Sequence, residues 1–127
     1  MIRAWLAAAA LGGFLSVGAG AIAAHLTSTD PRAAELLRTG ALYGMVHAAA
    51  LTAVAAMAGH RDQPGLVLIV AGWCFVTGVF LFSFSLFALA LTGIALFGRI
   101  TPFGGASLLL GWAALGLAAA RRQSPTR

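Results

Sequence analysis

Seven polar side chains stand in stretches of this sequence that are otherwise apolar, and they are the residues best able to do chemistry. They are His25, Tyr43, His47, Ser83, Ser85, Thr101 and Ser107. An imidazole ring can bind a metal ion, carry a proton or accept a hydrogen bond, and a hydroxyl group can both donate and accept. What these groups could do therefore depends on whether the fold brings them together.

Two kinds of chemistry find little support in the sequence. His25 and His47 are suitable ligands for a metal ion or haem, but no carboxylate or cysteine set with ligand spacing accompanies them. The three acidic residues all fall in polar connections, so none can orient a histidine, and the serines stand in no nucleophile-elbow motif. We expect no catalytic residues, no metal and no cofactor, and we expect that the protein is not an enzyme.

The elements that carry these side chains are membrane spans. The chain has 127 residues, of which 61% are hydrophobic and 9% charged, whereas a soluble domain has about 25% charged residues. Four apolar stretches are each long enough to cross a hydrocarbon core about 30 Å thick. We predict an all-α membrane protein, in which residues 1–127 form a single integral membrane domain. It is a four-transmembrane-helix bundle with helices at about 3–24, 31–58, 66–91 and 104–120.

Local signals place the helix ends. Asp30 is a good N-cap and Pro31 suits the first helical position, where its missing N–H costs nothing. The polar segment 59–65 is a turn between antiparallel helices, and Pro102 with the glycine pair after it marks the start of the fourth helix. The N-terminus also fits a secretory signal, but three further spans favour a retained helix.

Small residues predict where helices pack closely. The first helix is rich in glycine, so we expect it to lie centrally in the bundle, because small residues let helix backbones approach each other in lipid. The glycines expected to form packing contacts are Gly18, Gly20, Gly40, Gly104, Gly105 and Gly111.

The net charge of +5 comes from eight arginines that are scattered between the apolar runs. This distribution indicates membrane topology, and no nucleic-acid partner is expected. Arg3, Arg61, Arg121, Arg122 and Arg127 fall on one side of a four-span chain, and Arg32, Arg38 and Arg99 on the other. The positive-inside rule then places both termini in the cytoplasm.

By depth, the seven polar side chains fall at one level in the outer half of the bundle, so we expect one polar cluster there. Tyr43 and His47 lie four residues apart on one face of the second helix. We place His47 about 12 Å below the outer surface, facing inward and neutral, because burial disfavours the charged ring.

Each polar residue also has a purely structural interpretation. His47 can be a core histidine that links helices, and His25 can simply end the first helix at the polar boundary. Ser83 and Ser85 can bond back to carbonyls of their own helix. The pair Gly104 and Gly105 can serve close packing alone.

Four segments, GAIAAHL, TGALYGMVHAAAL, GVFLFSFSLFAL and TPFGGASLLLGW, together resemble the small four-helix membrane-protein family of unknown function that contains the bacterial YgdD proteins and eukaryotic transmembrane protein 256. The resemblance runs from about Gly18 to Trp112. It implies insertion in a membrane, here the bacterial inner membrane, with four spans. This chain departs from the family pattern at Ala23, Phe84 and Phe87, where glycine, glycine and tyrosine are usual, and these changes disfavour an open polar cavity.

Two classes of function follow. The leading hypothesis is a non-enzymatic accessory or packing subunit of a larger membrane assembly, whose partners are the lipid bilayer and either another membrane protein or further copies of the chain. The alternative is a small transporter, channel or proton-responsive sensor that uses the polar cluster. An accessory subunit keeps His47 dry, whereas a transporter or sensor must bring water to it.

Overall fold

The computed structural model describes residues 1–121, and all regular structure in this range is helical. The elements are α1 (Ile2–Leu26), α2 (Pro31–Gly59), α3 (Leu66–Val79), the π-helical turn η1 (Phe80–Phe84), α4 (Ser85–Thr92) and α5 (Ala95–Ala120). α3, η1 and α4 form one continuous span, so four helices are long and apolar enough to cross a membrane. The predicted all-α, four-helix architecture is confirmed. Arg122 and Arg127, which entered the topology prediction, lie outside the described residues.

The helix ends follow local chemistry. The carboxylate of Asp30 accepts a hydrogen bond from the Ala33 amide at 3.0 Å, with Pro31 at the first helical position, as the sequence predicts. Gly93 ends α4 in the left-handed conformation, at φ 69°, which glycine adopts without steric cost. The turn between α4 and α5 is therefore short.

The start of the fourth span differs from the prediction. α5 begins at Ala95 and contains Pro102 within it, so the expected start at residue 104 was wrong. A helix from 104 to 120 would be only about 26 Å long, shorter than the hydrocarbon core. Backbone groups in that core must bond within the chain, and a proline inside a membrane helix costs less than an unwound segment would.

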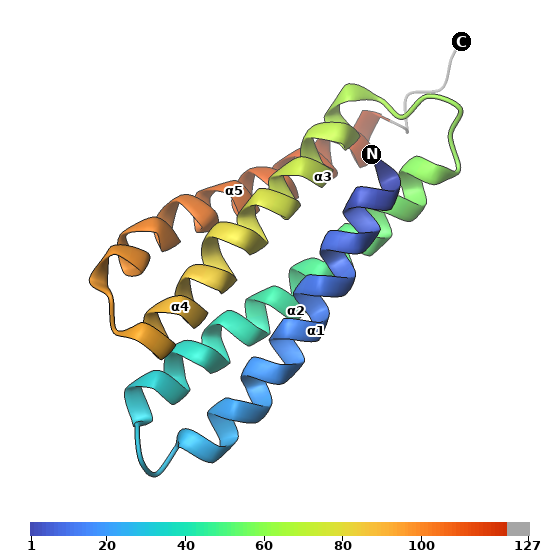
Figure 1. Cartoon of the computed structure of the whole chain (residues 1–127). Coiled ribbons are helices and arrows are strands. Elements are labelled where there is room, and N and C mark those ends of the chain that lie inside the picture. Colours follow the sequence, from blue (N-terminus) through green and yellow to red (C-terminus); the bar gives the residue numbers. More distant parts are fainter. Residues whose placement is uncertain (122–127) are drawn as a thin grey trace.

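Figure 1 shows two helical hairpins that lie side by side. α1 and α2 form one hairpin, α3 to α5 form the other, and α2 packs against both α1 and the α3–α4 span. α2 is thus the central helix: half of its most apolar 18 residues are buried, against 28% for α1. The expectation that α1 lies centrally was wrong, because α1 packs mainly against α2 and several of its small residues, such as Gly13 and Gly18, border open space. We call the end of the bundle with Ile2, Gly59 and Ala120 the terminal end.

Glycines set the closest approaches between helices. Of the six expected, Gly40, Gly104 and Gly111 lie so close to neighbours that an added Cβ would overlap them, Gly20 and Gly105 have room for one, and Gly18 borders open space. Three glycines that we did not predict, Gly44, Gly72 and Gly78, are equally tight. The added Cβ of Gly104 would meet the backbone of Leu81 and Phe82, within the π-helical turn. The two spans of the second hairpin therefore touch backbone to backbone.

Candidate functional site

His47 lies on the face of α2 that is turned toward the other hairpin, and only 6% of its surface is exposed. Its Nε2 accepts a hydrogen bond from the indole N–H of Trp112 on α5, at 3.0 Å. Its Nδ1 is 2.6 Å from the backbone carbonyl oxygen of Tyr43. An indole N–H can only donate, so Nε2 must be unprotonated and Nδ1–H must donate to the carbonyl. His47 is therefore neutral and held in one tautomer.

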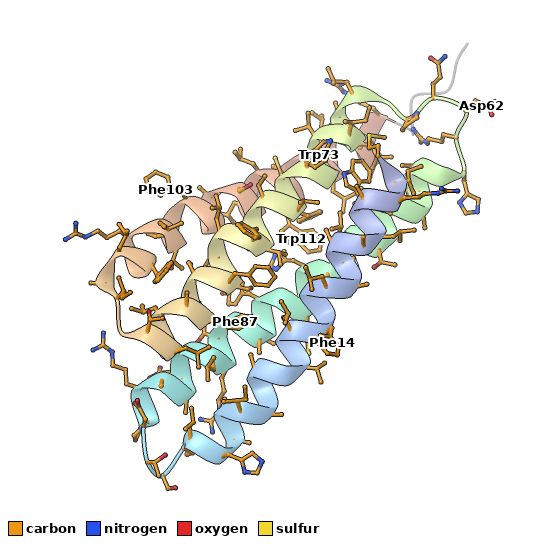
Figure 2. All side chains as sticks on the ribbon, viewed as in Figure 1. Phe14, Asp62, Trp73, Phe87, Phe103 and Trp112 are labelled. Atoms are coloured by element: carbon orange, nitrogen blue, oxygen red, sulfur yellow. The ribbon has the colours of Figure 1, made fainter. Side chains whose placement is uncertain are left out.

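Aromatic rings surround this hydrogen bond. The ring of His47 is 5.9 Å from that of Phe75, 6.0 Å from that of Trp112 and 5.9 Å from that of Tyr43, the last nearly parallel. Phe75 and Trp112 meet edge to face at 5.3 Å. Trp112 lies midway along the bundle, between the two hairpins (Figure 2). Tyr43 contributes its carbonyl and its ring face to the imidazole.

A second group of polar contacts joins α4 to α5. The hydroxyl oxygens of Ser85 and Thr101 are 2.8 Å apart. One hydroxyl of the pair donates to the other, and the accepting hydroxyl can donate to a carbonyl one turn earlier in its own helix, Ser85 to Phe82 at 2.9 Å or Thr101 to Phe97 at 3.2 Å. This pair ties the two spans of the second hairpin together near the end opposite the termini.

A third group joins α3 to α5. The Ser107 hydroxyl lies 2.8 Å from that of Thr77 and donates to the Cys74 carbonyl at 2.9 Å. The Thr77 hydroxyl donates either to Ser107 or to the Trp73 carbonyl, which lies 2.9 Å away. Ser107 therefore has a partner on the α3 backbone and a partner on an α3 side chain.

The two remaining predicted residues stand apart. Ser83 is fully buried, but its hydroxyl has no hydrogen-bond partner in the described part of the chain. It faces Gly44 of α2, where an added Cβ would lie 3.2 Å from its oxygen, and the unpaired hydroxyl of Ser16 lies at the same glycine. His25 is exposed at the end of α1.

The structure thus distributes the seven residues over separate contacts, and the single polar cluster expected at one depth is not formed. From Thr101 to Trp112 these contacts cover about 16 Å along α5. The reason is that Ser85 pairs with Thr101, and Ser107 with Thr77, each on the neighbouring helix at its own depth. Each such pair lowers the cost of burying its two hydroxyl groups in hydrocarbon.

Sequence reasoning missed Trp112 and Thr77 as partners. A signal for Trp112 was present, because an indole N–H within an apolar span needs an acceptor and the imidazole of His47 can supply one. The residues around Trp112 and His47 do not predict which helix faces bring these two side chains together.

The arrangement serves hydrogen bonding between helices. No group of three or more His, Cys, Asp or Glu residues that could hold a metal ion occurs within residues 1–121. Both ring nitrogens of His47 are already paired within the protein. The hydrogen bond between His47 and Trp112 joins α2 to α5.

Comparison with known proteins identifies similar sequences. A family model described as "Protein of unknown function (DUF423)" matches residues 19–105. The chain is 35% identical to the UPF0382 membrane protein YwdK of Bacillus subtilis over 122 residues, covering 94% of this chain and 98% of that protein. It is 38% identical to a UPF0382 membrane protein of Haemophilus influenzae, covering 91% and 92%.

A third relative has a more specific name. The chain is 35% identical to the UPF0382 inner membrane protein YgdD of Escherichia coli K12, covering 94% of this chain and 91% of that protein. No solved structure matches the chain.

Proposed function

Because the chain belongs to the DUF423 family of membrane proteins, whose biochemical function is unknown, we propose a role for it from its geometry. It acts as a non-enzymatic accessory subunit of a larger membrane assembly, and it does so through its helix surfaces. Its membrane is the bacterial inner membrane, which the name of the YgdD relative supports.

The observation that carries this proposal is the buried, fully paired state of His47. The ring is buried and both nitrogens are bonded within the protein. A cleft of about 350 Å³ among α1, α2, α3 and η1 is lined mainly by apolar side chains such as Leu11 and Phe80, and His47 does not border it. A histidine that moves protons needs water or another titratable group beside it.

The outer surface of the helices supports the same role. Only 17% of the most apolar 18 residues of α5 are buried within the chain, and Phe14 on α1 and Leu109 on α5 are 76% and 73% exposed. Within the described residues the connections are short turns, so the helix faces are the main surface that a partner could contact. That partner is another membrane protein or a second copy of this chain.

The alternative function, a transporter, channel or proton-responsive sensor, requires a different environment around His47. Water would have to reach His47, and protonation of Nε2 would place two N–H donors opposite each other and break the bond to Trp112. The burial of His47 and the pairing of both its ring nitrogens favour the accessory role over this alternative.

Site-specific photocrosslinking in living cells tests the proposal. A photoreactive residue is placed at Phe14 on α1 or at Leu109 on α5, and the same residue at Ser28 in the exposed turn is the matched control. We expect one helix face, but not the turn, to give a discrete adduct with one defined membrane protein or with a second copy of the chain.

A parallel measurement addresses the alternative. The purified protein is reconstituted in vesicles that contain a pH-sensitive dye, and proton entry is compared between wild type and His47→Gln. Proton entry that depends on His47, together with no adduct from either helix face, would overturn the accessory role.

A further inference from the structure

A pocket of about 230 Å³ opens at the terminal end of the bundle, between the α2–α3 turn and the end of α5. Two arginines line it from segments far apart in the sequence: Arg61 from the turn and Arg121 from the residue that follows α5. The remaining lining comes from the first turn of α3 and from Ala118. Two cationic groups therefore face one small space.

The charge of these arginines is not neutralised within the described chain. Arg61 is half-buried, yet no ion pair forms among residues 1–121. Of the three acidic residues, Asp30 and Glu35 belong to the opposite end of the bundle, and Asp62 is exposed. A guanidinium that is partly withdrawn from water favours an anionic partner, and its planar donors suit the oxygens of a phosphate group.

The start of α3 adds hydrogen-bond donors to the same pocket. Its N-cap is Gly65, which supplies no side-chain acceptor. The first amides of a helix, here those of Leu66 and Val67, have no partner within the helix. They also carry the positive end of the helix dipole, which attracts anions.

The depth of the pocket indicates the kind of anion. Arg61 lies just beyond the end of α2, and Arg121 just beyond the end of α5, at the boundary between the spans and the polar phase. Below them the wall is apolar, formed by Leu68 and Ala118. A ligand that fits has a phosphate at the surface and hydrocarbon below it.

We propose that this pocket binds the phosphate headgroup of an anionic phospholipid. Arg61 and Arg121 bind the phosphate oxygens, and the lipid chains continue along the outside of α3 and α5. This binding site is independent of the proposed accessory role, because it uses the end of the bundle and none of the residues near His47.

Native mass spectrometry of the purified protein in mild detergent tests the proposal, with phosphatidylglycerol as the anionic probe and phosphatidylcholine as the zwitterionic one. We expect phosphatidylglycerol to be retained and phosphatidylcholine to be lost at the same energy. Arg61→Gln and Arg121→Gln should each weaken binding about tenfold, the effect of removing one charged hydrogen bond. Arg3→Gln, at the same end but outside the pocket, is the matched control and should bind like wild type.

Three results would overturn this assignment. Equal retention of both lipids would show that charge is not recognised, and an equal loss in Arg3→Gln would show attraction to the general surface charge instead of a site. Competition by millimolar inorganic phosphate would identify a site for the free ion. Unchanged melting of the Arg61 and Arg121 variants without lipid verifies that any loss of binding is not a loss of folding.

Discussion

At the residue scale, the hydrogen bond between Trp112 and His47 is the main polar feature of the membrane interior. It is the one side-chain hydrogen bond within residues 1–121 that joins the two hairpins, since the others lie within a helix or a hairpin or involve the turns. The rings of both partners also contact the ring of Phe75. Removing either side chain leaves a polar group of the other without a hydrogen bond in hydrocarbon, which lowers the stability of the fold.

The tautomer of His47 gives a direct prediction. Because Nε2 accepts from an indole, nitrogen NMR of ring-labelled protein at neutral pH should show a protonated Nδ1 and an unprotonated Nε2. Trp112→Phe should remove this constraint while keeping most of the packing. A charged ring, or the opposite tautomer in the wild type, would contradict the geometry.

The stability of the pair gives a second prediction. We expect His47→Ala and Trp112→Phe each to lower the free energy of unfolding by about 0.5 to 2 kcal/mol, the range measured for hydrogen bonds in membranes. His47→Gln should recover part of this loss, because its amide can still accept from the indole. Unfolding in detergent measures all three, and a double variant that loses the sum of the single losses would show that the two residues do not interact.

At the element scale, the π-helical turn η1 and α5 determine how the second hairpin closes. The backbone at Leu81 and Phe82 lies directly against Gly104, whereas a Cβ added at Gly105 would lie 3.7 Å from the Phe82 ring, an ordinary van der Waals contact. Backbone cannot move aside as the end of a side chain can. Two adjacent glycines thus have different structural roles.

We predict that Gly104→Ala and Gly105→Ala differ sharply in stability. Gly104→Ala should lower the melting temperature markedly, because the new methyl group overlaps fixed backbone. Gly105→Ala should be neutral or slightly stabilising, since alanine favours helix by up to about 1 kcal/mol over glycine. Thermal unfolding of both variants in the same detergent decides this, and equal melting temperatures would place this face of α5 away from η1.

At the scale of the whole molecule, the four spans bring Ile2, the α2–α3 turn and Ala120 to one end of the bundle (Figure 1). The α1–α2 and α4–α5 turns lie at the other end. Which end faces the cytoplasm depends on the arginine distribution along the sequence. That distribution favours the terminal end as the cytoplasmic one.

Cysteine labelling tests this orientation. In a Cys74→Ala background, Ser28→Cys should react with a membrane-impermeant maleimide in intact cells, whereas Gln63→Cys should react only after permeabilisation. The reverse pattern would invert the orientation, and reaction of both from outside would contradict the four-span topology.

The sequence by itself determined the features that depend on local composition. The length and apolarity of each stretch predict four helical spans. Unpaired backbone groups are costly in hydrocarbon, and a helix pairs them within its own segment. Asp30 and Pro31 predict the start of α2 because capping uses only neighbouring residues. The polar residues that must find partners can likewise be read directly from the sequence.

Tertiary structure alone decided which of these residues meet. The spans are apolar on nearly all sides, so their hydrophobic pattern does not predict which face of α1 or α5 packs against a neighbour. In lipid, burial of apolar side chains does not favour one face over another. Rotation and register are set by steric fit at glycines such as Gly44 and Gly104. That fit places α2 at the centre and pairs Trp112 with His47 across the two hairpins. Neither segment alone predicts this pair, because steric fit depends on the shapes of both helices.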